Sequence, residues 1–224
     1  MILLYDKKYD CPNCKSEFTT KKPLSSKLRV EKVETDNHKL YKYVSPYIYE
    51  INVCPYCGFA FGEKANKNCD IKKTEKLLQY FLSVKDFSKL NQERNIDDAL
   101  RTFKLALYIA QIIAEPYYVR AGLSLKIAWL YREKESWEDE IKYLSKSYEN
   151  YKKSYTDENF EIAGYKRYFM FYTLAELSWR LDNYEGAKLW YGELFAEKNV
   201  PRLTMNNARD SWMEYKNQRK KAND

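Results

Sequence analysis

Residues 96–106 read IDDALRTFKLA, with apolar side chains that return every three or four positions. Because an α-helix has 3.6 residues per turn, this spacing places Ala99, Phe103 and Ala106 on one face of a helix. A second stripe with the same period runs through residues 141–155. The pattern therefore predicts that the larger part of the chain is helical.

Two further segments, residues 137–147 and 184–194, align with residues 96–106. Each begins with a bulky residue, followed by a small or variable residue three positions later and an apolar residue four positions after that. This order is typical of the second helix of a tetratricopeptide repeat, where the small residue lets the paired helix approach. Glu140 breaks the small-residue rule, and the segments are spaced more widely than the roughly 34 residues of a standard unit. We therefore expect a tetratricopeptide-like stack with extended helices.

The expected helix ends follow from capping residues and prolines. Asn95 and Ser136 stand where each can accept hydrogen bonds from the first N–H groups of a helix. Pro116 suits a first helical position, where a missing N–H costs nothing. About seven antiparallel helices are expected, over residues 74–92, 96–114, 116–134, 137–155, 158–181, 184–197 and 202–220. The last of them would cover the open end of the stack.

The most specific chemical feature is a pair of Cys-x-x-Cys motifs, Cys11-Pro-Asn-Cys14 and Cys54-Pro-Tyr-Cys57. Two residues between paired cysteines let both sulfurs of a tight turn face one cation, and two such turns complete a tetrahedral zinc site. We expect one structural Zn2+ per chain, because four cysteinate ligands leave no position for water. Gly58 suits the left-handed conformation that such a turn often needs after its second cysteine. The predicted metal ligands are Cys11, Cys14, Cys54 and Cys57.

Other uses of the cysteines are weaker hypotheses. Disulfide bonds are disfavoured in a cytosolic chain. Residues 54–57 match a glutaredoxin-type active-site motif, but a redox dithiol begins a helix, and the sequence after Cys57 does not predict one there. Cys69, the fifth cysteine, is expected to be a packing or inert thiol, with a reserve ligand as the alternative.

His38 stands near Glu34 and Asp36 at alternate positions, a pattern that could form a second metal site. A polar turn over residues 35–38 is the preferred interpretation, because Asp and Asn favour turns.

The region before about residue 70 differs from the helical part. Four of the six prolines lie before residue 60, and short apolar alternations over residues 26–33 and 47–53 predict half-buried strands. We therefore expect an α+β fold, in which a small zinc-ribbon-like β domain with four cysteine ligands, over residues 1–70, precedes an all-α tetratricopeptide-like repeat domain over residues 71–224.

The overall composition limits the classes of function. The 224 residues carry a net charge of +7 and a single histidine. The longest apolar stretches are far shorter than the roughly 18 residues of a spanning helix, and the first residues lack the apolar segment of a signal peptide. We expect a cytoplasmic protein with no membrane partner. A non-enzymatic role is also expected, because no phosphate loop, dinucleotide fingerprint or nucleophile elbow is present.

The leading hypothesis is a protein–protein interaction module, an adaptor or scaffold whose helical stack offers a concave face to a protein or peptide. Aromatic residues next to arginine are common in binding hot spots. The arginines are interpreted as surface residues, so that replacing them with Ala should cost at most about 0.5 kcal/mol. For the two tryptophans, packing between helices is the alternative. The predicted partner-binding residues are Trp129, Arg132, Tyr172, Glu176, Trp179 and Arg180.

The alternative function is a nucleic-acid-binding protein that uses the basic zinc ribbon. Residues 7–32 contain eight basic and three acidic side chains, a surplus that phosphates could use. No recognition helix or pattern of stacking aromatics accompanies it. The basic residues are Lys7, Lys8, Lys15, Lys21, Lys22, Lys27, Arg29 and Lys32.

Three segments carry a family resemblance: Cys11-Pro-x-Cys14, Lys22-Pro-Leu-Ser25-Ser26-Lys27-Leu28-Arg29, and Ser45-Pro46-x-x-Tyr49-x-Ile51-x-Val53-Cys54-Pro-x-Cys57-Gly58-Phe59-Ala60. Together they resemble the bacterial domain of unknown function 2225 family. Ser45 and Phe59 depart from the usual Asn and Tyr at their positions, and neither is a predicted metal ligand. The resemblance covers nearly the whole chain. It implies a cysteine-rich N-terminal part and a tetratricopeptide-like helical C-terminal part, and it implies no particular activity.

Overall fold

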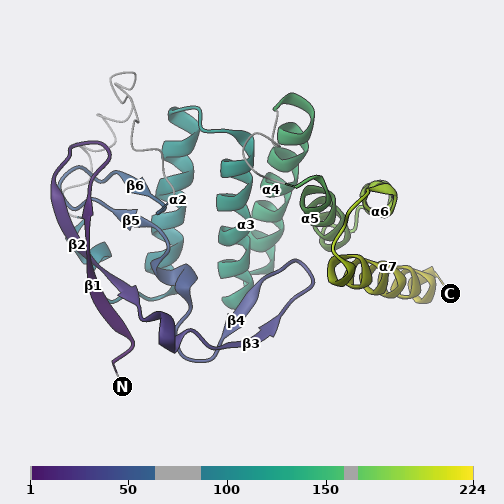
Figure 1. Cartoon of the computed structure of the whole chain (residues 1–224), viewed down its shortest axis with the longest axis horizontal. Coiled ribbons are helices and arrows are strands. Elements are labelled where there is room, and N and C mark those ends of the chain that lie inside the picture. The colour runs from purple at the N-terminus through teal and green to yellow at the C-terminus, as the bar shows by residue number, and fades with distance from the viewer. Residues whose placement is uncertain (1, 64–86, 159–165, 224) are drawn as a thin grey trace.

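The computed structural model describes residues 2–63, 87–158 and 166–223. Within these ranges, short antiparallel strand hairpins are followed by six α-helices (Figure 1). The predicted α+β class is therefore confirmed.

The strands pair as three separate two-stranded hairpins. In the second strand, Phe18, Thr20 and Lys22 alternate with more exposed residues and face the interior. This alternation is the period of two that a half-buried strand requires. The pairs are β1 (Leu4–Asp10) with β2 (Glu17–Pro23), β3 (Val30–Val33) with β4 (Lys39–Tyr41), and β5 (Asn52–Val53) with β6 (Ala60–Phe61).

The strand predicted over residues 47–53 is wrong for most of its length. Pro46–Tyr49 form the 3-10 helix η2, and the strand is confined to Asn52–Val53. Pro46 explains the difference, because its fixed φ and missing N–H suit the first turn of a helix and interrupt a strand. A second 3-10 helix, η1 (Ser25–Lys27), precedes β3.

Every described α-helix except the one that starts at Arg167 begins within one residue of its predicted start. The exception was expected over residues 158–181, of which residues 159–165 lie outside the described residues. The helix predicted over residues 74–92 falls mainly outside the described residues, and its described end is the 3-10 helix η4 (Ser88–Asn91). The described part of the chain thus contains six α-helices, one fewer than the seven that were expected. The helices are α2 (Ile96–Ile112), α3 (Tyr117–Glu133), α4 (Trp137–Asp157), α5 (Arg167–Arg180), α6 (Tyr184–Ala196) and α7 (Arg202–Asn223).

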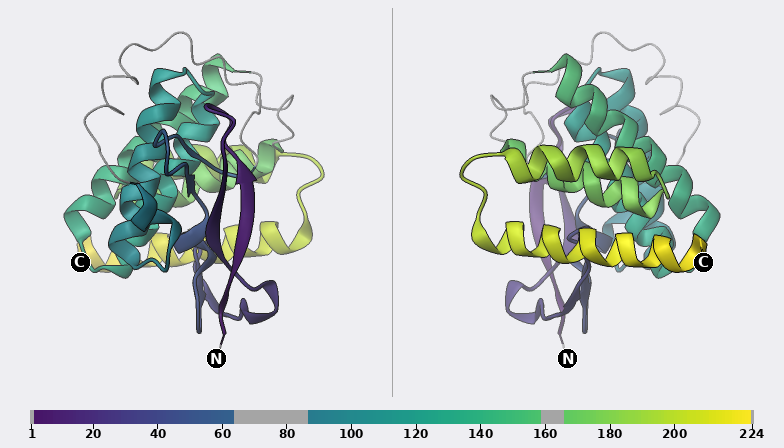
Figure 2. Two further views of the ribbon diagram at one scale, coloured as in Figure 1. Left: turned by 90° about the vertical axis from the view of Figure 1, so that its left-hand side faces the viewer. Right: turned by 90° about the vertical axis from the view of Figure 1, so that its right-hand side faces the viewer.

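Consecutive helices pack against one another from α2 to α7. Helices α2, α3 and α4 stand side by side, and α6 and α7 run across their direction (Figures 1 and 2). The β1–β2 and β5–β6 hairpins lie beside α2 at one end of the stack, whereas the β3–β4 hairpin lies near the lower end of α3 and points towards α5 (Figure 1). None of the described helices combines the length and the apolar character that crossing a membrane requires.

One continuous hydrophobic core joins the hairpins to the helices. Phe18 of β2 meets Phe61 of β6 edge-on, with 6.1 Å between the ring centroids. The same core includes Phe103 of α2 and Leu130 of α3. The predicted domain boundary near residue 70 lies outside the described residues, but this shared core fixes how the hairpins sit on the helices.

The N-terminus of α2 carries a capping box at Asn95. The Asn95 side chain accepts a hydrogen bond from the N–H of Asp98 at 2.9 Å, and the Asp98 carboxylate accepts one from the N–H of Asn95 at 3.2 Å. We predict that Asn95→Ala lowers the free energy of unfolding by about 1 kcal/mol, because Ala cannot accept the capping bond. Asn206→Ala on the exposed side of α7 is the control, since surface changes usually stay within about 0.5 kcal/mol. Equal midpoints of urea unfolding for the two variants would contradict the prediction.

Candidate metal centre and docking face

The two Cys-x-x-Cys motifs form the tips of two hairpins. Residues 11–14 connect β1 to β2, and residues 54–57 connect β5 to β6. In each turn the N–H of the first cysteine donates to the carbonyl five residues later, at 3.1 and 3.0 Å. The residue after the second cysteine has a positive φ in both turns, 69° for the expected Gly58 and 62° for Lys15. The same backbone turn therefore recurs, although the sequence indicated it at Gly58 alone.

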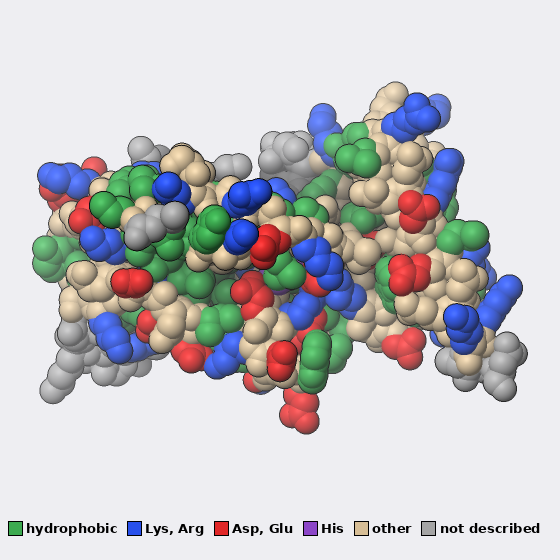
Figure 3. All heavy atoms as spheres, turned by 90° about the horizontal axis from the view of Figure 1, so that it is seen from below, with side chains coloured by type: hydrophobic (Ala, Val, Ile, Leu, Met, Phe, Trp, Pro, Cys, Tyr) green, Lys and Arg blue, Asp and Glu red, His purple; other side chains and the backbone are tan. Residues whose placement is uncertain are grey.

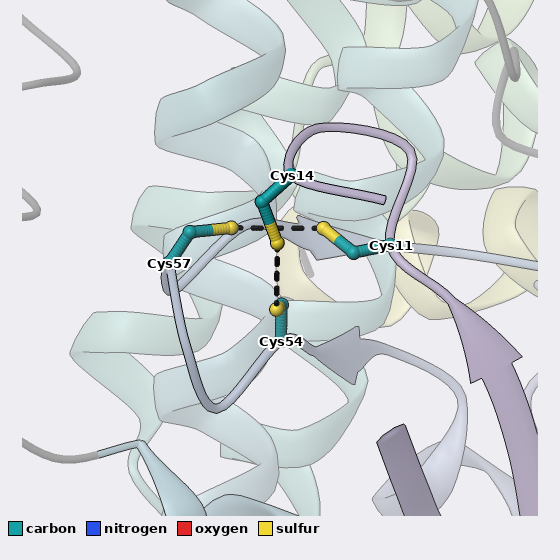
Figure 4. Close-up of side chains that lie close together, drawn as sticks. All are labelled: Cys11, Cys14, Cys54 and Cys57. Carbon is teal, nitrogen blue, oxygen red and sulfur yellow. Dashed lines mark hydrogen bonds between the residues drawn. The ribbon is translucent and has the colours of Figure 1, made fainter. Parts of the chain in front are cut away.

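These tips bring the four predicted ligands together (Figure 4). The four sulfurs lie within 4.8 Å of one another. The Sγ atoms of Cys11 and Cys57 are 3.6 Å apart, as are those of Cys14 and Cys54. A zinc ion with Zn–S bonds of about 2.3 Å would separate its sulfurs by about 3.8 Å in a tetrahedron, whereas a disulfide bond needs about 2.05 Å. All four are free cysteines, and their arrangement fits a tetrahedral metal ion.

The electrostatics of the cluster also favour a cation. Hydrogen bonding with Cys54 raises the pKa of Cys11 to about 12, and hydrogen bonding with Cys11 raises the pKa of Cys57 to about 12. Thiols packed this closely do not ionise together without a cation, whereas a thiol that coordinates a metal is deprotonated. The side-chain amide of Asn13 donates to Sγ of Cys57 at 3.5 Å, which would stabilise a thiolate there. Cys11 and Cys54 are fully buried and Cys14 is exposed.

The segment after Cys57 bears on the redox alternative. It continues through Gly58 into strand β6, so no helix begins at the second cysteine motif. The field of a helix N-terminus is what commonly lowers the pKa of a redox thiol, and the structure therefore favours a metal site over a redox site. Within the described ranges, the four cysteines are the only group of side chains placed to hold a metal ion. Cys69 lies outside those ranges.

Two buried cations hold the segment that leads into the second cysteine turn. Lys22 of β2 donates to the carbonyl of Tyr49, and Arg94 donates to the carbonyl of Ile51 at 2.8 Å. Burial lowers the pKa of Lys22 to about 8 and that of Arg94 to about 10. Lys22 was expected on a basic surface, and the buried position of Arg94 was not predicted. The alternation of β2 is the signal that could have placed Lys22 inside.

Five of the six predicted partner-binding residues face the turn between β3 and β4. Each of the five contacts residues 34–38, which we call the docked turn. The N–H of Asn37 donates to the carbonyl of Glu34 at 2.9 Å and Asn37 has a φ of 67°, so the expected polar turn is confirmed. We call the five residues the docking face: Trp129 and Arg132 of α3, and Tyr172, Glu176 and Arg180 of α5.

Two carboxylates of the docked turn meet two arginines of the docking face. Asp36 pairs with Arg132 at 2.8 Å and with Arg180 at 3.0 Å. Arg132 also pairs with Glu34 and, at 2.7 Å, with Glu140 of α4. Burial acts to raise the pKa of Asp36, but the hydrogen bond from Arg132 and the charges of both arginines outweigh it, so this pKa is lowered. The pKa of Glu34 is lowered by a similar balance. The lowered pKa values keep the carboxylates of Glu34 and Asp36 ionised at neutral pH.

Aromatic rings complete the contact with α3. The indole N–H of Trp129 donates to Asp36 at 3.0 Å, and the indole stacks on the imidazole of His38 with 5.1 Å between centroids. His38 is fully buried and lies 3.3 Å from Glu34 and 3.0 Å from Glu133. The side chains proposed for a second metal site are thus bound to protein groups, and the structure supports the polar turn instead.

The remaining predicted residues lie on α5. The Tyr172 hydroxyl donates to the carbonyl of Thr35 at 2.7 Å. Glu176 is fully buried, and burial raises its pKa. Trp179 lies elsewhere, against Tyr215 of α7 with 5.4 Å between ring centroids. For Trp179, the structure shows the packing contact that was the alternative to binding.

The basic residues of the strand region are mostly paired or buried. Lys22 is buried, and four other lysines lie within 4 Å of carboxylates. Seen from below, acidic and basic side chains are interspersed over the middle of the molecule (Figure 3). A phosphate backbone would have to compete with these carboxylates. The pairs are Lys7–Glu63, Lys8–Glu17, Lys21–Asp6 and Lys32–Glu34.

The fold and the site define an α+β protein in which a four-cysteine cluster that could bind a metal ion lies on strand hairpins at one end of a helical stack. The chain belongs to the family described as "Uncharacterized protein conserved in bacteria (DUF2225)", whose model matches residues 4–215. This match confirms the resemblance seen in the sequence. No curated protein and no solved structure matches the chain.

Proposed function

We propose that the protein is a non-enzymatic cytoplasmic adaptor, in which one structural zinc ion stabilises the strand hairpins and a tetratricopeptide-like helical stack binds a protein or peptide partner. Four cysteinate ligands leave a zinc ion no position for water or substrate, so the ion would contribute folding free energy and no chemistry. A reducing cytoplasm would keep the four cysteines available as thiolate ligands.

One observation carries the partner-binding part of this proposal. The docking face already binds a short acidic segment of its own chain, with two arginines on carboxylates and a tyrosine on a backbone carbonyl. Arginine, tryptophan and tyrosine are the residues that most often dominate binding energy at protein interfaces. The planar guanidinium group suits carboxylates because its N–H groups are held in a fixed fork.

We predict that Arg180→Ala weakens partner capture about tenfold, the loss expected for one hot-spot side chain. Arg180 is suited to this test because its side chain is 25% exposed and Arg132 still holds both carboxylates of the docked turn when Arg180 is removed. Tagged wild type and variant would be used to recover partners from a lysate of the native organism, with partners identified by mass spectrometry. Arg202→Ala, at an exposed position of α7, is the matched control. Equal recovery by all three chains at matched melting temperature would contradict the proposal.

Nucleic-acid binding through the strand region ranks second, because carboxylates pair with four of its lysines. Binding of DNA or RNA at micromolar protein that falls steeply with salt would reverse this ranking, since each neutralised phosphate releases counterions.

A further inference from the structure

The β3–β4 hairpin contacts helices α3 and α5 through its turn, and β4 also contacts Tyr47 of η2, whose ring centroid lies 5.9 Å from that of Tyr41. All four residues of β3 are exposed, whereas Asp36 and His38 in the docked turn are buried. The hairpin has no third strand among the described residues, and an isolated two-stranded hairpin is at best marginally stable in water. Docking of the turn therefore helps to fix where the hairpin lies.

The docking face contacts three chemical features of the docked turn. Two arginines bind the carboxylates at positions 34 and 36. Tyr172 bonds the backbone carbonyl at position 35, and Trp129 stacks on the ring at position 38. These contacts involve a five-residue segment and none of the β3 residues. A segment of another protein with the same features could make them all.

A docking face without the turn would favour an acidic ligand. Arg132 would keep Glu140 as a partner, but Arg180 would lose its ion pairs with both carboxylates of the turn. Burial raises the pKa of Glu176, so this carboxyl group resists ionisation and supplies little compensating charge. Because an uncompensated charge at a half-buried site is unfavourable, a ligand that displaces the turn must bring carboxylates of its own.

We propose that the docking face recognises a partner segment with the pattern Glu-x-Asp followed two residues later by an aromatic or histidine ring, and that the docked turn is an internal competitor of this partner. The inference rests on the proposed function and names the chemistry of the partner for the same face. When only a fraction of the molecules is in the binding-competent state, the apparent affinity of a ligand is reduced in proportion to that fraction. The docked turn would thereby keep the face closed to weak ligands.

The test uses a fluorescently labelled synthetic peptide that contains residues 30–41 of this chain, followed by fluorescence anisotropy. The full chain is compared with a Glu34→Gln/Asp36→Asn double variant, whose own turn lacks the carboxylates. We expect the peptide to bind the double variant at least about tenfold more tightly than the wild type, because the internal competitor is weakened. Adding Arg180→Ala to the double variant should weaken peptide binding about tenfold, as for partner capture, and adding Arg202→Ala should leave it unchanged. A peptide with Gln and Asn at the two acidic positions should not bind.

No peptide binding by a double variant that keeps the helical circular dichroism of the wild type would overturn the inference. Equal affinity of the peptide for the wild type and the double variant would show that the docked turn does not compete with the peptide. If the double variant does not fold, the inference is tested by amide exchange of the wild type. Saturating peptide must then speed amide exchange at Glu34 and Asn37, whose N–H groups are bonded within the docked turn at 2.8 and 2.9 Å, and unchanged exchange overturns the inference. Partner capture that depends on Arg180, without any peptide binding, would overturn this inference and leave the proposed function standing.

Discussion

Replacing Cys54 with serine is expected to release the zinc ion that we propose at the four-cysteine cluster and to unfold the strand hairpins, while most of the helical structure remains. Cys54 is fully buried and belongs to the four-sulfur cluster. Binding of structural zinc contributes apparent free energies of about 10–16 kcal/mol in zinc-finger peptides, and that energy is folding energy. The hairpins are two-stranded, and such hairpins are marginal without other support. The helices pack on one another in chain order and keep their own contacts.

The measurement is the zinc content of freshly purified protein by elemental analysis, together with far-ultraviolet circular dichroism. We expect about one equivalent of zinc in the wild type and less than about half in the Cys54→Ser variant. Cys69→Ser is the matched control and should keep its zinc, because Cys69 lies outside both Cys-x-x-Cys motifs. Unchanged zinc in Cys54→Ser, or a wild type with little zinc, would show that the cluster is not a zinc site. Chelation of the metal from the wild type should likewise leave most of the helical signal in place. Loss of that signal would show that the helices depend on the metal.

Replacing Arg132 with alanine is expected to lower the free energy of unfolding by about 3–5 kcal/mol, the range for breaking a buried ion pair. The sequence suggested a surface arginine, for which the cost would be at most about 0.5 kcal/mol. In the structure, the Arg132 side chain is 10% exposed and pairs with Glu34, Asp36 and Glu140. Its removal leaves three carboxylates with fewer or no partners in a poorly solvated site. Urea unfolding followed by circular dichroism measures the change.

Two comparisons separate this effect from lost packing. Arg202→Ala, at an exposed position of α7, should change stability by at most about 0.5 kcal/mol. Combining Arg132→Ala with Glu34→Gln and Asp36→Asn should recover part of the loss, because the uncompensated charges are then gone. If the single variant costs less than about 1 kcal/mol, or the triple variant is no more stable than the single one, the buried ion-pair network does not stabilise the docked turn.

The sequence by itself determined the features that depend on residues a few positions apart. The apolar period of α2, the cap at Asn95, the two cysteine turns and the left-handed Gly58 all follow from contacts within one or two turns of the chain. A hydrogen bond between neighbours in sequence has nearly the same geometry in any protein, so these elements could be located without a structure. The strand expected over residues 47–53 failed because a proline turn, itself local, outweighed the apolar alternation.

Only the tertiary structure decided what the docking face binds and where the charged side chains lie. Arg132 and Asp36 are 96 residues apart in the sequence, and no spacing rule links them. Arg132 and Arg180 were predicted as partner-binding residues, but no sequence pattern could show that a turn of the same chain supplies carboxylates to both of them. Lys22 was likewise expected on the surface. Its partner, the carbonyl of Tyr49, lies far from it in the sequence, so no local pattern indicated the contact. Whether a charge is buried depends on the partners beside it in space, since burial without a partner is too costly.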